Sequence, residues 1–274
     1  MPELPEVQTV VDTLSQFIID KEIIDVNVIK GKIIAKPKEV QEFIRILEGS
    51  KIEGVRRRGK YIIINLDNQY YYVTHLRMTG RFIYSKEEEQ DKYDCIIFGF
   101  DDGSRLRLGS KRKFTRTYLV KKLDEAGSLT KLGPEPLLDE FTLDKFKKML
   151  INRRGRIKPL LLNQKFLAGL GNIYVDEALF IAKIHPVTTA DALNGDQIEK
   201  LYDAIRQVLS EGIKYRGTTK WDYVDAAGRS GSYQEYLRVY DKEGKECINC
   251  GNKLERIKVG GRSSYFCPSC QKRE

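Results

Sequence analysis

Cys247-Ile248-Asn249-Cys250 and Cys267-Pro268-Ser269-Cys270 lie sixteen residues apart near the end of the sequence. Each Cys-x2-Cys forms a tight knuckle that directs two thiolates toward one point, and two knuckles complete a tetrahedron. This spacing predicts a zinc ribbon holding one Zn²⁺, a structural ion because four thiolates leave no open coordination position. The alternative is two disulfides, which a chain without a secretion signal disfavours. Cys95, in an apolar strand-like run, is expected to be a buried small hydrophobe.

The residues between the knuckles predict a β-hairpin. Residues 254–259 and 264–266 are rich in strand formers and flank Gly260-Gly261, a pair typical of a tight turn. Arg262 follows at the tip. An arginine held there by a metal and a turn can make two parallel hydrogen bonds to one phosphate, whereas alone it would more often be a solvated tip residue.

Upstream of the zinc ribbon, apolar residues recur with a helical period from Thr142 onward. The pattern predicts helices over residues 143–151, 157–164, 173–182 and 195–215. Between the second and third, Gly169-Leu170-Gly171-Asn172 allows a sharp turn, and Asn172 is expected to be the N-cap of the following helix. Such a turn presents backbone N–H groups to a phosphate, although helical hairpins without ligands are common.

The first 130 residues predict one helix followed by an antiparallel β-sandwich or barrel. The expected strands are 23–29, 51–57, 61–66, 70–76, 95–100, 105–108 and 115–120. Residues 131–136 are a plausible linker to the helical part. Residues 217–234 contain three glycines and little periodicity, which predicts a mobile loop of a length that is often functional. The fold class is therefore α+β.

Met1-Pro2-Glu3-Leu4-Pro5-Glu6-Val7 suggests covalent chemistry. Once Met1 is removed, Pro2 carries a secondary amine, and an α-amino group titrates near ~8. A helix is predicted from Pro5, and its positive end would lower the pKa of this amine further. Such an amine can form a Schiff base with a sugar carbon, with Glu3 as general acid and base and Glu6 complementing the helix dipole. The alternative is that these residues have no chemical role and only form a frayed segment that leads into the helix.

The formal charge of +9 indicates a polyanionic partner, with nucleic acid favoured over a membrane surface. Arginine and lysine cluster at residues 56–60, 111–113 and 153–156. The alternative is that this charge only aids solubility. No apolar run reaches the ~20 residues that span a bilayer, and no signal peptide is visible. We therefore expect a soluble, cytoplasmic protein.

Together these features resemble the formamidopyrimidine-DNA glycosylase family (Fpg, or MutM) of base-excision repair enzymes. The resemblance runs from end to end of the chain. It rests on Pro2–Val7, Gly59-Lys60-Tyr61, His75–Met78, Lys111–Phe114, Ile157-Lys158-Pro159, Gly169–Tyr174, Gly260–Ser263 and Cys267–Gln271. The start Glu-Leu-Pro-Glu is similar to the formamidopyrimidine branch, because the related endonuclease VIII branch usually has glycine after its first glutamate.

The resemblance implies three parts: a catalytic β-sandwich domain (1–131), a helix-two-turn-helix DNA-binding domain (132–240) whose loop 217–234 caps the lesion, and a zinc finger (241–274). It implies that the chain, as a monomer, removes oxidised purines from double-stranded DNA and cleaves the strand by β,δ-elimination. Pro2 would attack C1′ of the damaged nucleoside. Glu3 would move protons, Lys60 would bind phosphate and assist elimination, and Arg262 would bind phosphate.

The resemblance also implies DNA contacts for residues outside the catalytic group. Asn172 and Arg154 would bind phosphates, while Met78, Arg112 and Phe114 would fill the gap that the extruded nucleotide leaves. Taken singly, Met78 and Phe114 could instead belong to the core, and Lys60 or Arg154 could be solvated charges.

Two departures from the family pattern leave the lesion preference open. Around Arg112 the family has Asp-x-Arg-Arg/Lys-Phe-Gly, and this chain has neither that aspartate nor that glycine. Tyr93, a candidate DNA contact, stands where the family often has histidine. A paralogue acting on oxidised pyrimidines or abasic sites, and a non-catalytic protein that binds damaged DNA, are the alternatives.

Overall fold

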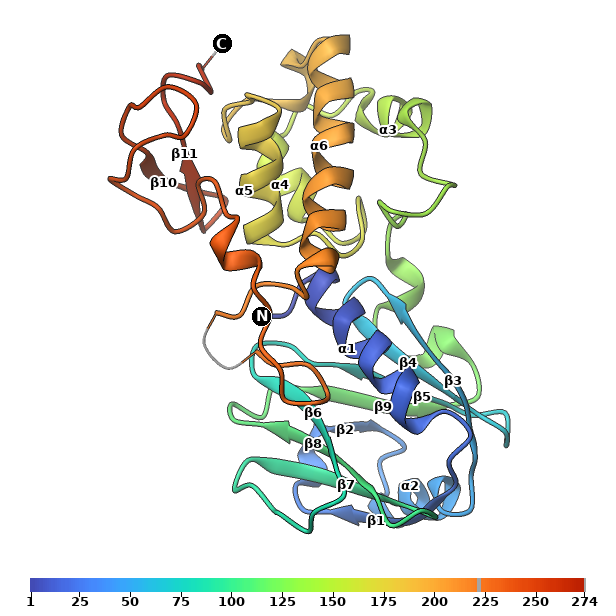
Figure 1. Cartoon of the computed structure of the whole chain (residues 1–274). Helices are drawn as coiled ribbons and strands as arrows, with labels where there is room; N and C mark the ends of the chain where they lie inside the picture. The colour runs from blue at the N-terminus through green and yellow to red at the C-terminus, as the bar shows by residue number, and fades with distance from the viewer. Residues whose placement is uncertain (221–222, 274) are drawn as a thin grey trace. The chain divides into compact units, whose positions relative to one another are not determined.

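The computed structural model describes residues 1–220 and 223–273. The chain forms two compact units. Unit 1 comprises Met1–Lys131 and Tyr215–Ser232, and unit 2 comprises Leu132–Lys214 and the residues from Tyr233 onward. Figure 1 labels their helices and strands.

Helix α1 (Leu4–Ile18) confirms the amphipathic helix predicted at the start of the chain. Pro5 lies in its first turn, where a missing N–H costs nothing. Glu3 is the N-cap, and the Glu6 side chain accepts the Glu3 N–H at 2.8 Å, as in a capping box. The predicted apolar stripe is buried, with Val7, Val10, Val11, Leu14 and Ile18 all inside unit 1.

Two β-sheets form most of the rest of unit 1. The four-stranded sheet has the order β1-β7-β8-β6 and the five-stranded sheet the order β2-β9-β5-β4-β3. The strands are β1 (Ile23–Val28), β2 (Ile34–Lys36), β3 (Ile52–Arg58), β4 (Tyr61–Leu66), β5 (Tyr71–His75), β6 (Gly80–Ser85), β7 (Asp94–Phe100), β8 (Arg105–Ser110) and β9 (Arg116–Val120). Among the described residues, the pairing of β2 with β9 is parallel and the other pairings are antiparallel. The predicted sandwich is therefore confirmed, apart from one short parallel edge.

A single hydrophobic cluster joins α1 to both sheets of unit 1. It includes Val10 of α1, Tyr72 of β5 and Phe98 of β7. Tyr223 and Ala226 belong to the same cluster, although the sequence predicts a mobile loop over residues 217–234. These two residues are packed into the core of unit 1, which a free loop would not allow. Residues 221–222 of the predicted loop lie outside the described residues.

Unit 2 contains the four predicted helices and the predicted hairpin. The helices are α3 (Leu143–Leu150), α4 (Ile157–Leu162), α5 (Asn172–Ile181) and α6 (Gly195–Lys214). The hairpin strands β10 (Glu255–Val259) and β11 (Arg262–Phe266) are antiparallel, and Val259 pairs with Arg262 across Gly260-Gly261. Helix α5 packs against α4, α6 and β11, so the hairpin is fixed to the helical part (Figure 1).

The turn before α5 corrects the prediction for Asn172. Gly171 is the N-cap, and Asn172 is the first residue of the helix. Its side-chain amide instead donates to the Ser263 carbonyl at 2.9 Å, so Asn172 bonds to the hairpin rather than to its own helix. The expected linker also packs within unit 2, because the Gly133 N–H donates to Gln164 O at 2.8 Å.

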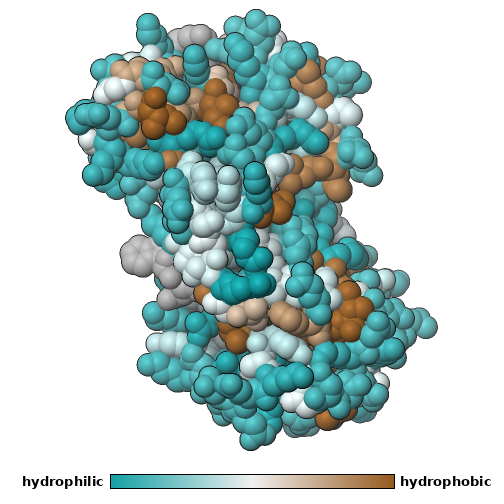
Figure 2. Space-filling model, viewed as in Figure 1, coloured by the Kyte–Doolittle hydropathy of each residue, from teal (hydrophilic) through white to brown (hydrophobic). Residues whose placement is uncertain are grey.

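The surface of both units is predominantly polar on the face drawn in Figure 2, where apolar residues are scattered among hydrophilic ones. Across residues 1–220 and 223–273, no helix combines the length and the apolar character needed to span a bilayer. On a surface that is mostly polar, large apolar side chains that are exposed beside an arginine mark candidate binding positions.

Candidate functional site

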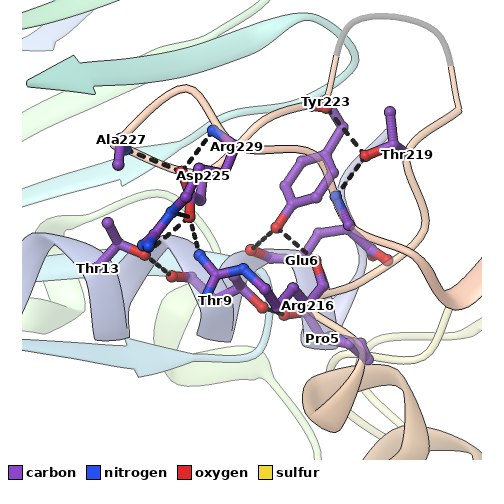
Figure 3. A network of polar contacts seen from close by, with 11 residues as sticks. Pro5, Glu6, Thr9, Thr13, Arg216, Thr219, Tyr223, Asp225, Ala227 and Arg229 are labelled. Carbon is purple, nitrogen blue, oxygen red and sulfur yellow. Dashed lines mark hydrogen bonds and ion pairs between the residues drawn. The ribbon is translucent and has the colours of Figure 1, made fainter.

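The N-terminus of α1 holds the expected nucleophile and its acid. Met1 is 53 % exposed, whereas Pro2 and Glu3 are buried. With Met1 in place the Pro2 nitrogen is an amide, so nucleophilic chemistry at Pro2 requires its removal. The Glu6 carboxylate accepts the Glu3 N–H through Oε2 and the Thr218 N–H, at 2.7 Å, through Oε1. Glu6 thus links the residue beside Pro2 to the segment 215–232 (Figure 3).

Lys60 lies at the turn between β3 and β4 and is only 5 % exposed, so it is not a solvated surface charge. His75, at the end of β5, is also buried, and its Nδ1 accepts the Arg77 N–H at 3.0 Å. Burial, followed by the positive charges of Arg77 and Lys60, lowers the pKa of His75 to about 3. At neutral pH the imidazole is uncharged, and Lys60 supplies a cation suited to an anionic ligand.

Met78, Arg112 and Phe114 lie together on the surface of unit 1. Met78 is 47 % and Phe114 49 % exposed, so the core alternative for both is wrong. The Arg112 guanidinium donates to Met78 Sδ at 3.2 Å and lies 5.0 Å from the centroid of the Phe114 ring. Two exposed apolar side chains therefore flank one arginine at the surface.

Tyr93 lies close to this group along the sheet. Its carbonyl accepts the Ser110 N–H at 2.9 Å, two residues before Arg112. Lys92 and Lys111 place their ammonium groups 5.2 and 5.9 Å from the Tyr93 ring centroid. The half-buried ring therefore sits in a cationic environment, consistent with a region that meets an anionic polymer.

In unit 2 the predicted phosphate-binding residues occur near the hairpin and in the turn after α3. Arg262 is exposed where β11 begins, beside Ser263, whose carbonyl accepts the Asn172 amide. Arg154 is exposed in the turn between α3 and α4. The bond from the Asn172 amide to Ser263 O therefore holds Asn172 beside the residue that follows Arg262. Arg154 lies in a separate turn.

A fully buried ion pair supports the Arg262 hairpin. Lys158 of α4 donates to Asp176 of α5 at 2.6 Å and to Ser263 O at 2.7 Å. Asp176 also accepts the Tyr265 N–H at 3.1 Å, and both charged side chains are at most 1 % exposed. Burial raises the pKa of Asp176 to about 7, opposed by the Lys158 charge and the Tyr265 N–H. Two helices and the hairpin therefore share one buried polar network.

Replacing Lys158 with methionine is expected to destabilise the chain by about 3–5 kcal/mol, because Asp176 would be left buried without its cation. The double variant Lys158→Met/Asp176→Leu should be less destabilised than the sum of the two single variants. Urea unfolding at fixed pH measures all of these free energies. Additive losses in the double variant would show that the pair is not the coupled unit described.

The four cysteines of unit 2 fit a single Zn²⁺. Their sulfur atoms lie within 4.8 Å of one another, and the Cys247–Cys270 and Cys250–Cys267 pairs are 3.8 and 3.5 Å apart. A zinc–sulfur distance of about 2.3 Å places tetrahedral sulfurs about 3.8 Å apart. All four thiols are free of disulfide bonds, so the disulfide alternative is wrong. Cys95 is free and fully buried, as predicted.

Three family profiles match successive parts of the chain. Residues 1–117 match the formamidopyrimidine-DNA glycosylase N-terminal domain, residues 132–223 the formamidopyrimidine-DNA glycosylase H2TH domain, and residues 244–273 the zinc finger found in FPG and IleRS. The third match agrees with the cysteine geometry, and the chain has a single structural zinc site.

Curated relatives and solved structures cover the whole chain. The formamidopyrimidine-DNA glycosylase of Pelotomaculum thermopropionicum is 48 % identical, with 99 % of each chain covered. That of Bacillus cereus is 43 % identical over the full length of both. A crystal structure of Lactococcus lactis Fpg with abasic-site DNA aligns with a TM-score of 0.90 at 36 % identity, covering 99 % of this chain and 100 % of that one.

The fold, the four-cysteine site and the family matches together define the class of protein, which is a zinc-finger DNA glycosylase of base-excision repair. The chain belongs to the formamidopyrimidine-DNA glycosylase family.

Sequence reasoning missed three residues that organise the site. Glu6 was expected only to complement the helix dipole, but it also bonds Thr218. A signal for Lys158 existed, because a lysine inside an apolar helical run is unusual unless it is paired. Asp225 had only the signal of a local turn, in which it accepts the Ala227 N–H, whereas its contact with Thr13 of α1 spans more than 200 positions in the sequence.

Proposed function

We propose that this glycosylase removes oxidised purines from double-stranded DNA and then cleaves the abasic strand as a lyase. The supporting observation is the buried Pro2-Glu3 pair at the start of α1, in a chain of this family. Two solved relatives agree with the substrate class: Lactococcus lactis Fpg is bound to DNA containing N7-benzyl-Fapy-dG, and a MutM to DNA containing carbocyclic 8-oxo-G.

In the proposed first step, the unprotonated Pro2 nitrogen bonds to C1′ while the bond from C1′ to the base breaks. The base leaves with the bonding electron pair and takes up a proton. Glu3 then protonates the ring oxygen O4′, the C1′–O4′ bond opens, and an iminium joins Pro2 to the sugar. The positive iminium acidifies C2′–H, so loss of that proton expels the 3′-phosphate.

Loss of the C4′ proton then expels the 5′-phosphate, and water hydrolyses the remaining iminium to free the Pro2 amine. Lys60 is proposed to hold a phosphate near the sugar and to stabilise the leaving charge, since it is a buried cation beside a neutral His75. The zinc takes no part in these steps. When bound, it fixes the hairpin that carries Arg262.

DNA binding is assigned to residues of both units. Met78, Arg112 and Phe114 would occupy the space of the extruded nucleotide, beside Tyr93, and Arg154, Asn172 and Arg262 would bind phosphates. We assign catalysis to residues 1–131, DNA binding to 132–240, with capping by 217–234, and the zinc finger to 241–274. We further propose that the enzyme acts as a monomer inside the cell, where its substrate is.

Borohydride trapping across a lesion panel tests this function. Duplexes carrying 8-oxoguanine, a formamidopyrimidine, an oxidised pyrimidine or an abasic site are incubated with protein that mass spectrometry shows to lack Met1. We expect covalent adducts with the purine lesions and the abasic site. No adduct with any duplex would exclude the lyase, and a stronger adduct with the pyrimidine lesion would overturn the assigned substrate.

A further inference from the structure

The segment 215–232 forms a closed loop within unit 1. The Ser232 N–H donates to Tyr215 O at 2.9 Å, and the Gly231 N–H donates to Thr219 Oγ1 at 2.7 Å. A Cβ at Gly231 would collide with the Gly217 carbonyl, so the two ends of the loop lie in direct contact. The two ends of the loop are therefore held together at its base. The orientation of the loop then depends on the contacts that the described residues 223–229 make with the rest of unit 1.

One attachment point is Glu6. The Glu6 side chain accepts the Thr218 N–H. In addition, the Tyr223 hydroxyl lies 3.2 Å from the Glu6 carbonyl oxygen and 3.1 Å from the Arg216 carbonyl oxygen. Gly217 has a φ of +79°, and a Cβ there would meet the Glu6 side chain. The loop consequently lies against the same glutamate that receives the Glu3 N–H (Figure 3).

The second attachment point is Asp225, whose side chain is 0 % exposed. One carboxylate oxygen accepts the N–H groups of Ala227 and Arg229, both at 2.9 Å. The other accepts Arg229 Nε at 3.0 Å and the Arg216 guanidinium, and it lies 3.4 Å from Thr13 Oγ1 of α1, which donates to Thr9 O at 2.7 Å. Figure 3 shows these groups converging on Asp225 from both sides of the loop and from the helix.

We propose that Asp225 is a positioning residue for excision of the damaged base, an inference that rests on the proposed function. Its carboxylate ties Arg216, Ala227 and Arg229 together and holds the loop against Thr13 of α1. This helix carries Glu6 in its first turn and follows directly after Pro2 and its N-cap, Glu3. Without the Asp225 carboxylate, two guanidinium groups would lose their shared counter-charge, and the backbone N–H groups of Ala227 and Arg229 would lose their acceptor. The loop would then shift relative to Glu6, and the part of it that meets the base would be misplaced.

Substitution of Asp225 is expected to affect two activities of the enzyme differently. Excision of a base requires the loop to be in place, whereas attack on the open sugar of an abasic site requires the Pro2 amine but no base recognition. In Asp225→Ala, single-turnover excision of 8-oxoguanine should therefore fall about 10- to 100-fold, the scale of a misplaced substrate contact. Borohydride trapping with abasic-site DNA should remain within about threefold of the unsubstituted enzyme.

Three further variants serve as controls. Asp225→Asn keeps an acceptor oxygen without the charge and should fall between the parent and Asp225→Ala. Arg229→Gln removes one half-exposed partner and should show a smaller loss in the same direction. Gln16→Ala changes an exposed residue of α1, outside the loop, and should match the parent in both assays. Thermal unfolding reports whether each variant is folded at the assay temperature.

Equal losses in both assays would mean that Asp225 only stabilises the fold, and unchanged excision would overturn the proposal outright. If Asp225→Ala does not fold, Asp225→Asn and Arg229→Gln carry the same test. Failure of the proposed function would look different, because the unsubstituted enzyme would then neither excise a base nor form an adduct.

Discussion

Blocking the Pro2 nitrogen is expected to abolish the borohydride adduct with abasic-site DNA. In a variant with an extension retained before Met1, the Pro2 nitrogen stays in a peptide bond, where resonance removes its lone pair from nucleophilic attack. In the processed chain the same nitrogen is a secondary amine with a free lone pair when unprotonated, at the positive end of α1. Base excision should fall by about 10³-fold or more, equivalent to ~4 kcal/mol of transition-state stabilisation.

Two substitutions distinguish the nucleophile from its surroundings. Pro2→Gly keeps an α-amine but loses the ring that is buried at this position, and we expect excision to fall at least about 100-fold through misplacement. Glu3→Gln keeps the amine and removes the acid, so excision should drop about 10²- to 10⁴-fold while some abasic-site adduct still forms. Full adduct formation by the chain extended before Met1 would show that another amine is the nucleophile.

The sequence predicted the parts of the fold that have strong local signals. α1 was found because its apolar residues repeat at helical spacing, and the zinc site because four cysteines have the spacing of two knuckles. Three elements were missed: β2, with three residues; β6, which begins at Gly80; and α2 (Val40–Leu47), which buries only Phe43 and Leu47. β2 is too short to produce a period of its own, and β6 begins with glycine, which is depleted in strands. α2 does have a helical period, because Val40, Phe43, Ile44 and Leu47 stand at i, i+3, i+4 and i+7, but it is only eight residues long.

The candidate site was less predictable where distant segments meet. Met78 and Arg112 could be named from motifs, but only the structure shows that their side chains are in contact. Asn172 looked like an N-cap because asparagine favours that position, yet Gly171 is the N-cap, and Asn172, one residue further on, donates its amide to Ser263 O. Loop composition predicted mobility for residues 217–234, while tertiary burial of Tyr223 and Ala226 overrides that local preference.

Loss of zinc is expected to cause the other large effect, on DNA affinity. A structural zinc contributes about 10–16 kcal/mol in zinc-finger peptides, and Cys247 and Cys267 are almost fully buried here. The β10–β11 hairpin lies between the two knuckles, so the metal fixes both of its ends. Without zinc, the docking of Ser263 and Tyr265 on α4 and α5 would remain to hold Arg262 in position.

Chelation, with metal loss confirmed by a colorimetric zinc assay, should therefore weaken DNA binding about as much as Arg262→Ala does in the zinc-loaded protein. Both changes should reduce the slope of log affinity against log salt by about 0.9, the value for one phosphate contact. Cys95→Ala is the matched control, because it removes a buried thiol of unit 1 and should leave one zinc per chain and the affinity unchanged. If metal-free protein kept its DNA affinity, the zinc would have no role in placing Arg262, and the hairpin's contacts with α4 and α5 alone would hold it there.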